Sequence, residues 1–173
     1  YALDGGATLV PEDVLLTTFE VQARERLFTV PQIQVPVKVT VSEGIEFLGY
    51  DLEETSARHG NTLAFTLYWR ALRPMETSYT VFTHLLDQGE VVRGQRDSVP
   101  AMGKRPTTGW AAGEVIVDPY EMPVNADAPP GDYRLEIGMY DPSTGERPPM
   151  SRADGSPIFE RRILLREVIQ VRA

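Results

Sequence analysis

The sequence predicts an all-β protein, a two-sheet antiparallel β-sandwich of the immunoglobulin-like or jelly-roll-like type with little helix. Segments in which apolar and polar residues alternate recur along the chain, with turn residues between them. Val, Ile and Thr are abundant, and 14 glycines and 14 prolines favour turns over helices. The length of 173 residues suits a single domain with a sizeable core. We therefore expect one domain over residues 1–173, with roughly seven to nine strands.

The N-terminal residues 1–44 are less regular than the rest of the chain. They carry strand-like pieces at 14–21 and 27–30. Residues 31–41 alternate cleanly but contain two prolines, which cannot donate a hydrogen bond to a neighbouring strand. This segment is therefore expected to be an edge strand or an extended crossing.

The central part of the chain carries the clearest strand patterns. Residues 62–72 alternate strictly, and residues 79–86 are apolar on both faces. A turn then leads into residues 91–97, so a hairpin is expected there. Another alternating strand covers residues 132–141. The inward positions predict a core that includes Phe47, Leu63, Phe65, Leu67, Trp69, Val81, Leu85, Leu135, Ile137 and Met139.

The remaining segments complete the sandwich. A long loop over residues 98–113 precedes a strand candidate at 114–122, and residues 141–146 have the composition of a turn. Residues 158–171 could also be a helix. The alternation near their end and the β-rich context favour one or two terminal strands, so that residues 151–173 close the domain.

Charge and composition exclude several classes of function. A formal net charge of −8 argues against a nucleic-acid backbone or an anionic membrane surface as partner. The absence of cysteine excludes disulfides, thiolate nucleophiles and cysteine-based metal sites. His59 and His84 follow no metal-ligand spacing, and the longest charge-free stretch, 27–37, is too short to insert into a membrane. No nucleophile elbow or phosphate loop occurs, so no catalytic residue, metal ligand or cofactor is predicted.

The many acidic and basic side chains have simple structural explanations. Glycoside hydrolysis needs two carboxyl groups held about 5–10 Å apart, whereas the acidic residues here lie mostly in turns or at outward strand positions. The acidic clusters at 87–90 and 141–146 could hold calcium, but tight turns need the same residue types. Arginines near the C-terminus stand beside glutamates, which indicates a solvated face; they are Arg161, Arg162, Arg166 and Arg172.

Five residues are candidates for ligand contact: Trp110, Tyr140, Arg134, Glu136 and His84. Three of them, Arg134, Glu136 and Tyr140, project from the face opposite the core stripe of their strand. A ring with charged neighbours is a combination found in sugar sites. The alternatives are that Trp110 plugs one end of the sandwich, that His84 is a satisfied half-buried histidine, and that the remaining residues are ordinary surface.

An ordered series of segments resembles a known family. The segments are Phe47-Leu-Gly-Tyr-Asp-Leu-Glu53, Thr62 to Leu72, Tyr79 to Asp87, Gln95-Arg-Asp-Ser-Val-Pro100, Arg105-Pro-Thr-Thr-Gly-Trp110, Gly113 to Asp118 and Pro129 to Arg147. Over about residues 45–150 the chain resembles the soluble C-terminal region of large bacterial membrane proteins related to dolichyl-phosphate-mannose–protein mannosyltransferases, common in the Chloroflexus group. The turn at 87–90 is about one residue shorter than the family's Asp-x-Asp-Gly turn, which argues against a ligand role for it.

The resemblance implies a context and no catalytic residue. In that family, sugar transfer belongs to the membrane-embedded part, which residues 1–173 do not include. The resemblance thus implies a non-catalytic accessory domain on the extracytoplasmic face of the bacterial membrane. Its partners would be the upstream membrane domain of the same polypeptide and a glycan or acceptor. A structural or protein-interaction sandwich without sugar affinity is the alternative, and a soluble glycoside hydrolase is a more remote one.

Overall fold

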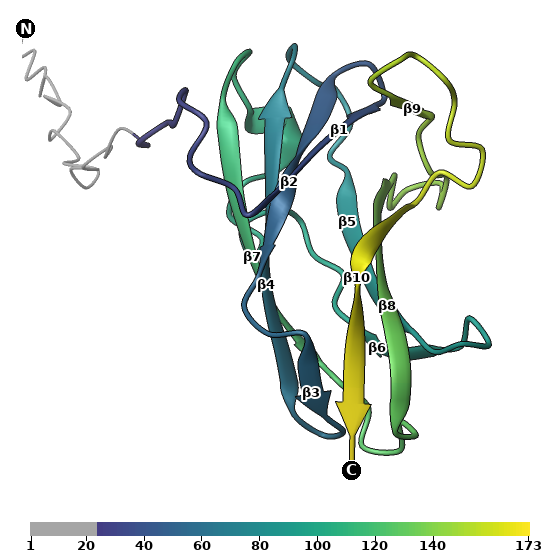
Figure 1. Cartoon of the computed structure of the whole chain (residues 1–173). Helices are drawn as coiled ribbons and strands as arrows, with labels where there is room; N and C mark the ends of the chain where they lie inside the picture. Colours follow the sequence, from purple (N-terminus) through teal and green to yellow (C-terminus); the bar gives the residue numbers. More distant parts are fainter. Residues whose placement is uncertain (1–23) are drawn as a thin grey trace, which may run out of the picture.

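The computed structural model describes residues 24–173, in which ten strands form two sheets packed face to face (Figure 1). The first sheet has the order β7-β4-β2-β1-β9 and the second β3-β10-β8-β5-β6. The strands are β1 (Val35–Val41), β2 (Ile45–Leu52), β3 (Ser56–Arg58), β4 (Thr62–Ala71), β5 (Thr80–Leu86), β6 (Val92–Gln95), β7 (Val115–Pro123), β8 (Gly131–Tyr140), β9 (Met150–Arg152) and β10 (Ile163–Arg172).

The predicted β-sandwich and its predicted core are confirmed. All ten residues expected in the core are at most 2% exposed, because the inward faces of both sheets interdigitate. Helix is limited, in the described part, to one 3₁₀ turn, η1 (Thr107–Gly109). No helix of residues 24–173 is long and apolar enough to span a membrane. The ambiguous C-terminal stretch forms a single strand, β10, with a bulge between Leu164 and Val168.

Two details differ from the expected pattern. The strand count exceeds the expected range because β3 and β9, of three residues each, are too short to show a period. One pairing is parallel, since β3 runs beside the end of β10 in the same direction, whereas the other pairings between strands are antiparallel.

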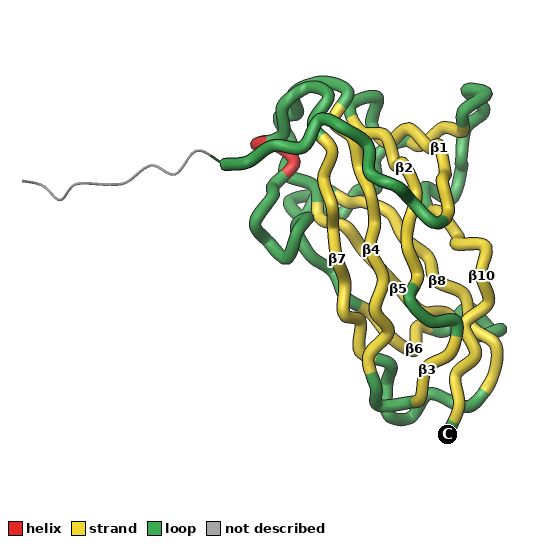
Figure 2. The backbone as a smooth tube through the Cα atoms, turned by 60° about the vertical axis from the view of Figure 1, so that its left-hand side comes forward, coloured by secondary structure: helices red, strands yellow, loops and turns green. Residues whose placement is uncertain are grey.

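The N-terminal segment crosses the outer face of the first sheet before it joins that sheet as β1 (Figure 2). The strand expected at 27–30 is wrong: only Leu27 forms an isolated bridge, to Val115 of β7. The piece expected at 14–21 lies outside the described residues. As the prolines predicted, Pro36 lies in the part of β1 that pairs with β2 alone, whereas β9 pairs only with Val39–Val41.

This crossing depends on the absence of a side chain at Gly49 of β2. Gly49 has a φ of +138°, and a Cβ there would lie 2.2 Å from the carbonyl oxygen of Val35 and 2.9 Å from Ile33. The same residue marks an irregularity in the β2–β4 register. A glycine is therefore required for both the backbone conformation and the close approach of β1.

Gly49→Ala should lower the free energy of unfolding by at least about 2 kcal/mol, because a Cβ would displace the β1 backbone. Gly103→Ala is the control: its φ of +84° is also positive, but a Cβ there meets nothing within 4 Å. Urea unfolding followed by tryptophan fluorescence measures both variants. Equal losses in the two would contradict the importance of the contact.

A buried carboxylate joins the core to the long loop between β6 and β7. Asp118 of β7 has no exposed surface and accepts hydrogen bonds from the Trp69 indole Nε1 (3.0 Å), the Tyr120 hydroxyl (3.0 Å) and the Ala101 backbone N–H (2.7 Å). Burial raises the pKa of Asp118 from 3.8 to about 6, although these three donors oppose the shift.

Asp118→Asn should lower the free energy of unfolding by about 1–3 kcal/mol, because an amide NH₂ cannot replace an accepting oxygen. The raised pKa means that the native protein keeps a proton that the unfolded chain loses between about pH 4 and 6. The contribution of Asp118 to wild-type stability should therefore fall as the pH rises through this window, and the variant should lack this contribution. Urea unfolding across the window measures this, with the exposed Asp132→Asn as control. Parallel pH profiles for wild type and Asp118→Asn would refute the assignment.

Candidate functional site

Four of the five predicted site residues share the outer face of the second sheet. The register of β5 and β8 places outward side chains in successive rows, namely Thr80 with Tyr140, Phe82 with Gly138, His84 with Glu136, and Leu86 with Arg134. Trp110 is elsewhere: its ring is 3% exposed within the core, and its indole N–H donates to the carbonyl of Arg105 (2.8 Å). The ring therefore offers no face to a ligand.

A row of alternating charges crosses this face. His84 lies between two carboxylates, with Nδ1 2.8 Å from Glu136 and Nε2 3.6 Å from Asp97. Arg162 donates to Glu136 (2.9 Å) and also reaches Glu90 in the β5–β6 turn (2.8 Å). Burial alone would raise the pKa of Glu136, but the hydrogen bonds from His84 and Arg162 outweigh it and hold that pKa below its ordinary value.

Aromatic residues on the same face are largely covered. Phe82 is 1% exposed, and the guanidinium of Arg147 lies 4.1 Å from its ring centre. The β8–β9 connection, which carries Arg147, thus covers this ring. Tyr140 is half-buried, and burial, followed by the charge of Asp97, raises the pKa of its hydroxyl. None of these rings forms an open stacking platform.

Arg134 lines a small cavity beside the charged row. The cavity has a volume of about 240 Å³ and lies between the β5–β6 turn and the strands β8 and β10. Its apolar lining comes from Leu86, Leu164 and Val168, and Glu90 and Asp132 stand at its polar side. Arg134 is oriented by a hydrogen bond to the carbonyl of Leu165 (3.1 Å).

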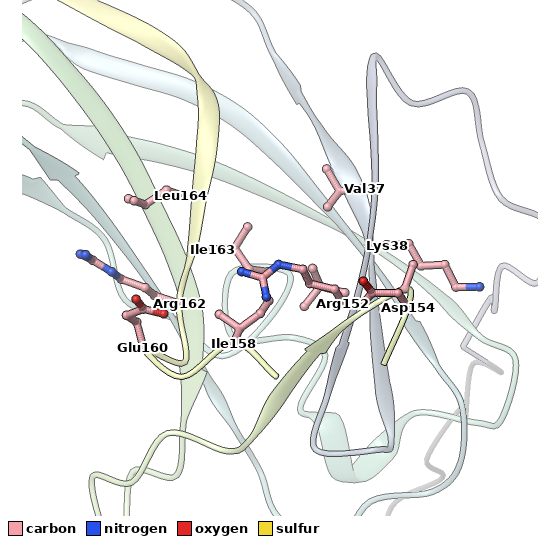
Figure 3. A pocket seen from close by; sticks show the side chains of 11 residues that line it. Val37, Lys38, Arg152, Asp154, Ile158, Glu160, Arg162, Ile163 and Leu164 are labelled. Carbon is pink, nitrogen blue, oxygen red and sulfur yellow. The ribbon is translucent and has the colours of Figure 1, made fainter. Parts of the chain in front are cut away.

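A larger cavity of about 680 Å³ adjoins it on the other side of β10 (Figure 3). It lies where the β1 edge of the first sheet faces β10, and Val37, Ile158 and Ile163 contribute apolar lining. Figure 3 shows Arg152 extending toward Ile158 and Ile163, whereas Lys38 and Arg162 point outward on opposite sides. Leu164 lines both cavities, so the two adjoin at this residue of β10.

Sequence reasoning missed three residues at this surface: Arg152 of β9, Arg162 just before β10, and Leu164 of β10. The sequence predicts a solvated face for the four arginines near the C-terminus. Arg162 instead joins the charged row, because β10 begins beside the middle of β8, where Ile163 pairs with Ile137. The alternation that places Ile163 and Leu165 in the core and Leu164 outside was the available signal.

The carboxylates beside His84 do not have the arrangement of a glycosidase site. Asp97 and Glu136 flank His84, whose imidazole fills the space in which a glycosidic bond would have to lie between two carboxylates. Within residues 24–173, no group of three or more His, Asp or Glu side chains could hold a metal ion.

Glu136→Gln should lower the free energy of unfolding by about 1–3 kcal/mol at neutral pH, since His84 and Arg162 would lose a charged acceptor. A lowered native pKa stabilises the fold above the ordinary pKa of 4.5, and this contribution is lost as the pH falls through the native value. The difference in the free energy of unfolding between wild type and variant should therefore disappear at acidic pH. Urea unfolding from about pH 7 to 3 tests this, with the exposed Glu121→Gln as control. A difference that stays constant in acid would contradict the ion-pair explanation.

Comparison with known proteins supports the fold alone. No protein-family model and no curated protein matches the sequence. Among solved structures, the chain is similar to the C-terminal domain of wzt, with a TM-score of 0.53 and 16% identity over 80% of this chain and 82% of that chain. A second similarity is to a CARDB domain from Pyrococcus furiosus, solved with di-metal ions, with a TM-score of 0.38 and 10% identity over 90% of this chain and 100% of that chain. The chain is a β-sandwich domain.

Proposed function

We propose that this chain is a non-catalytic β-sandwich domain that recognises a glycan, or a glycan-bearing acceptor, on the surface around β10. The observation that carries the proposal is the pair of adjoining cavities, of about 680 and 240 Å³, with apolar walls and arginines at their borders. Sugar rings present CH-rich faces that need apolar contact, and hydroxyl groups that need hydrogen-bonding partners. Apolar side chains and arginine donors are both present in these cavities, which supports the proposal.

The two cavities suit successive units of an extended ligand. The larger lies within the range of about 300–1,000 Å³ that is typical of small-molecule sites, and the smaller lies just below it. Arg134 in the smaller cavity and Arg152 in the larger would donate to hydroxyl oxygens, while Leu164 between them would contact the ring faces. Because no open aromatic ring lies on this surface, we expect a dissociation constant of about 1 mM, or roughly −4 kcal/mol.

We further propose that the domain is an accessory part of a bacterial integral-membrane glycosyltransferase and lies on the extracytoplasmic face of the membrane. The ordered segments from Phe47 to Arg147 support this through their resemblance to such proteins. Catalysis would then belong to the upstream membrane domain of the same polypeptide. The absence of a catalytic carboxylate pair around His84 is compatible with this division of labour.

Titration of the isotope-labelled domain with mannose-type and other oligosaccharides tests glycan recognition. We expect amide shifts confined to Arg134, Arg152, Leu164 and their neighbours, with saturation in the millimolar range. The double variant Arg134→Ala/Arg152→Ala should lose the shifts. Arg172→Ala, which removes an exposed arginine at the far end of β10, should keep them.

Two results would overturn the proposal. An absence of shifts at about tens of millimolar ligand would reject recognition of the glycans tested and favour a structural or protein-interaction sandwich. Reproducible turnover of lipid-linked sugars or chromogenic glycosides, abolished by one Asp or Glu substitution, would refute the non-catalytic assignment.

A further inference from the structure

A second polar cluster lies at the end of the sandwich where the described chain begins. The carboxylate of Glu114, just before β7, is 1% exposed and contacts three arginines. Its Oε1 lies 3.3 Å from Arg24 and 3.4 Å from Arg105, and its Oε2 accepts a hydrogen bond from Arg26. We call Arg24, Arg26, Arg105 and Glu114 the arginine cluster.

The local structure holds these side chains in place. The Ala111 backbone N–H donates to Oε2 of Glu114 (2.8 Å), Arg26 donates to the carbonyl of Gly109 (3.2 Å), and Arg105 donates to the carbonyl of Glu25 (3.0 Å). Figure 2 shows η1 beside the point where the described chain begins. The guanidinium positions are thus set by the loop before β7.

The arginine cluster carries more positive charge than its carboxylate can balance. One buried carboxylate needs one cation for compensation, yet three guanidinium groups approach Glu114. Their side chains remain 31% exposed at Arg24, 37% at Arg26 and 27% at Arg105. Among the ion pairs of residues 24–173, the three guanidinium groups share this one carboxylate, which leaves an excess of two positive charges. Arg24 and Arg105 bond the same oxygen, so their like charges lie close together.

The guanidinium groups also retain donors that can reach a ligand. A guanidinium has five N–H donors in a planar fork. Arg24 uses one of them toward Glu114, and each of the other two arginines bonds Glu114 and one backbone carbonyl. The donors that have no partner within residues 24–173, on side chains about one-third exposed, can bind an anion from solvent. Oxygen atoms of phosphate match this fork geometry in a bidentate manner.

We propose that the arginine cluster is a binding site for a phosphate group. A phosphate with two negative charges would balance the excess charge and accept hydrogen bonds from more than one guanidinium. Glu114 is the positioning residue, because it draws the three side chains together. This site is separate from the surface around β10, so it can hold whether or not glycan recognition does.

The same chemistry could come from a soluble phosphate compound or from a lipid headgroup. The competing explanation is that the arginine cluster serves only as a clamp, which fastens residues 24–26 to the loop before β7. A clamp would need the arginines for stability and would show no saturable response to phosphate. The two explanations therefore predict different results for the same titration.

The experiment is a titration of the labelled protein with inorganic phosphate at constant ionic strength, with chloride as the reference salt. We expect saturable shifts confined to the amides of residues 24–26 and 105–114 and to the three arginine Nε–H signals. Arg24→Gln is the diagnostic variant, because within residues 24–173 the Arg24 side chain bonds Glu114 alone, and its loss should preserve the fold. We expect it to weaken phosphate binding about tenfold, whereas Arg172→Gln should bind as wild type.

Sedimentation with vesicles of phosphatidylcholine, with or without phosphatidic acid, separates the two sources of phosphate. Binding only to vesicles that contain phosphatidic acid, lost in Arg24→Gln, supports a lipid headgroup. Saturable phosphate shifts without vesicle binding support a soluble phosphate compound. Shifts that are not saturable, that chloride reproduces or that Arg24→Gln retains unchanged would overturn the proposal. They would support the explanation that the arginine cluster is only a structural clamp.

Discussion

The buried carboxylate of Asp118, on β7 of the first sheet, accepts three hydrogen bonds and has no exposed surface. Two of the donors, from Trp69 and Tyr120, belong to the core of the sheet, and the third is the backbone N–H of Ala101 in the long loop. A carboxylate removed from water must find such partners, and an unpaired one would destabilise the fold. This constraint fastens the loop to the core, so that Trp110 closes the end of the sandwich and Arg105 meets Glu114.

The larger cavity follows from the lengths of the edge strands. The short strand β3 pairs only with the last residues of β10, from Gln170, and β9 pairs only with Val39–Val41 of β1. The parts of β1 and β10 beyond these pairings face each other across the open side of the sandwich, where the cavity lies. Longer edge strands would have closed this side and removed the proposed ligand surface. The residues of β1 and β10 that lie beyond these pairings thus border the larger cavity.

The sequence predicts only part of the candidate site. Period-two alternation correctly placed Arg134, Glu136 and Tyr140 on one face, because side chains alternate along a strand whatever its neighbours are. It could not show that Arg162 would reach Glu136, since that contact depends on the β8–β10 register and on the bulge in β10. Nor could it show the charges that surround Glu114, because the residues involved come from separate segments.

The sequence by itself determined the fold class, the core and most strand positions. The reason is that the alternation of apolar and polar residues along a strand is a local pattern, which identifies the buried face. The inward positions from Phe47 to Met139 needed no tertiary information. Only the tertiary structure decided that Trp110 is buried, that Gly49 admits β1, and that two cavities adjoin at Leu164. These features depend on strand order and on contacts between distant segments, and composition and periodicity carry no information about either.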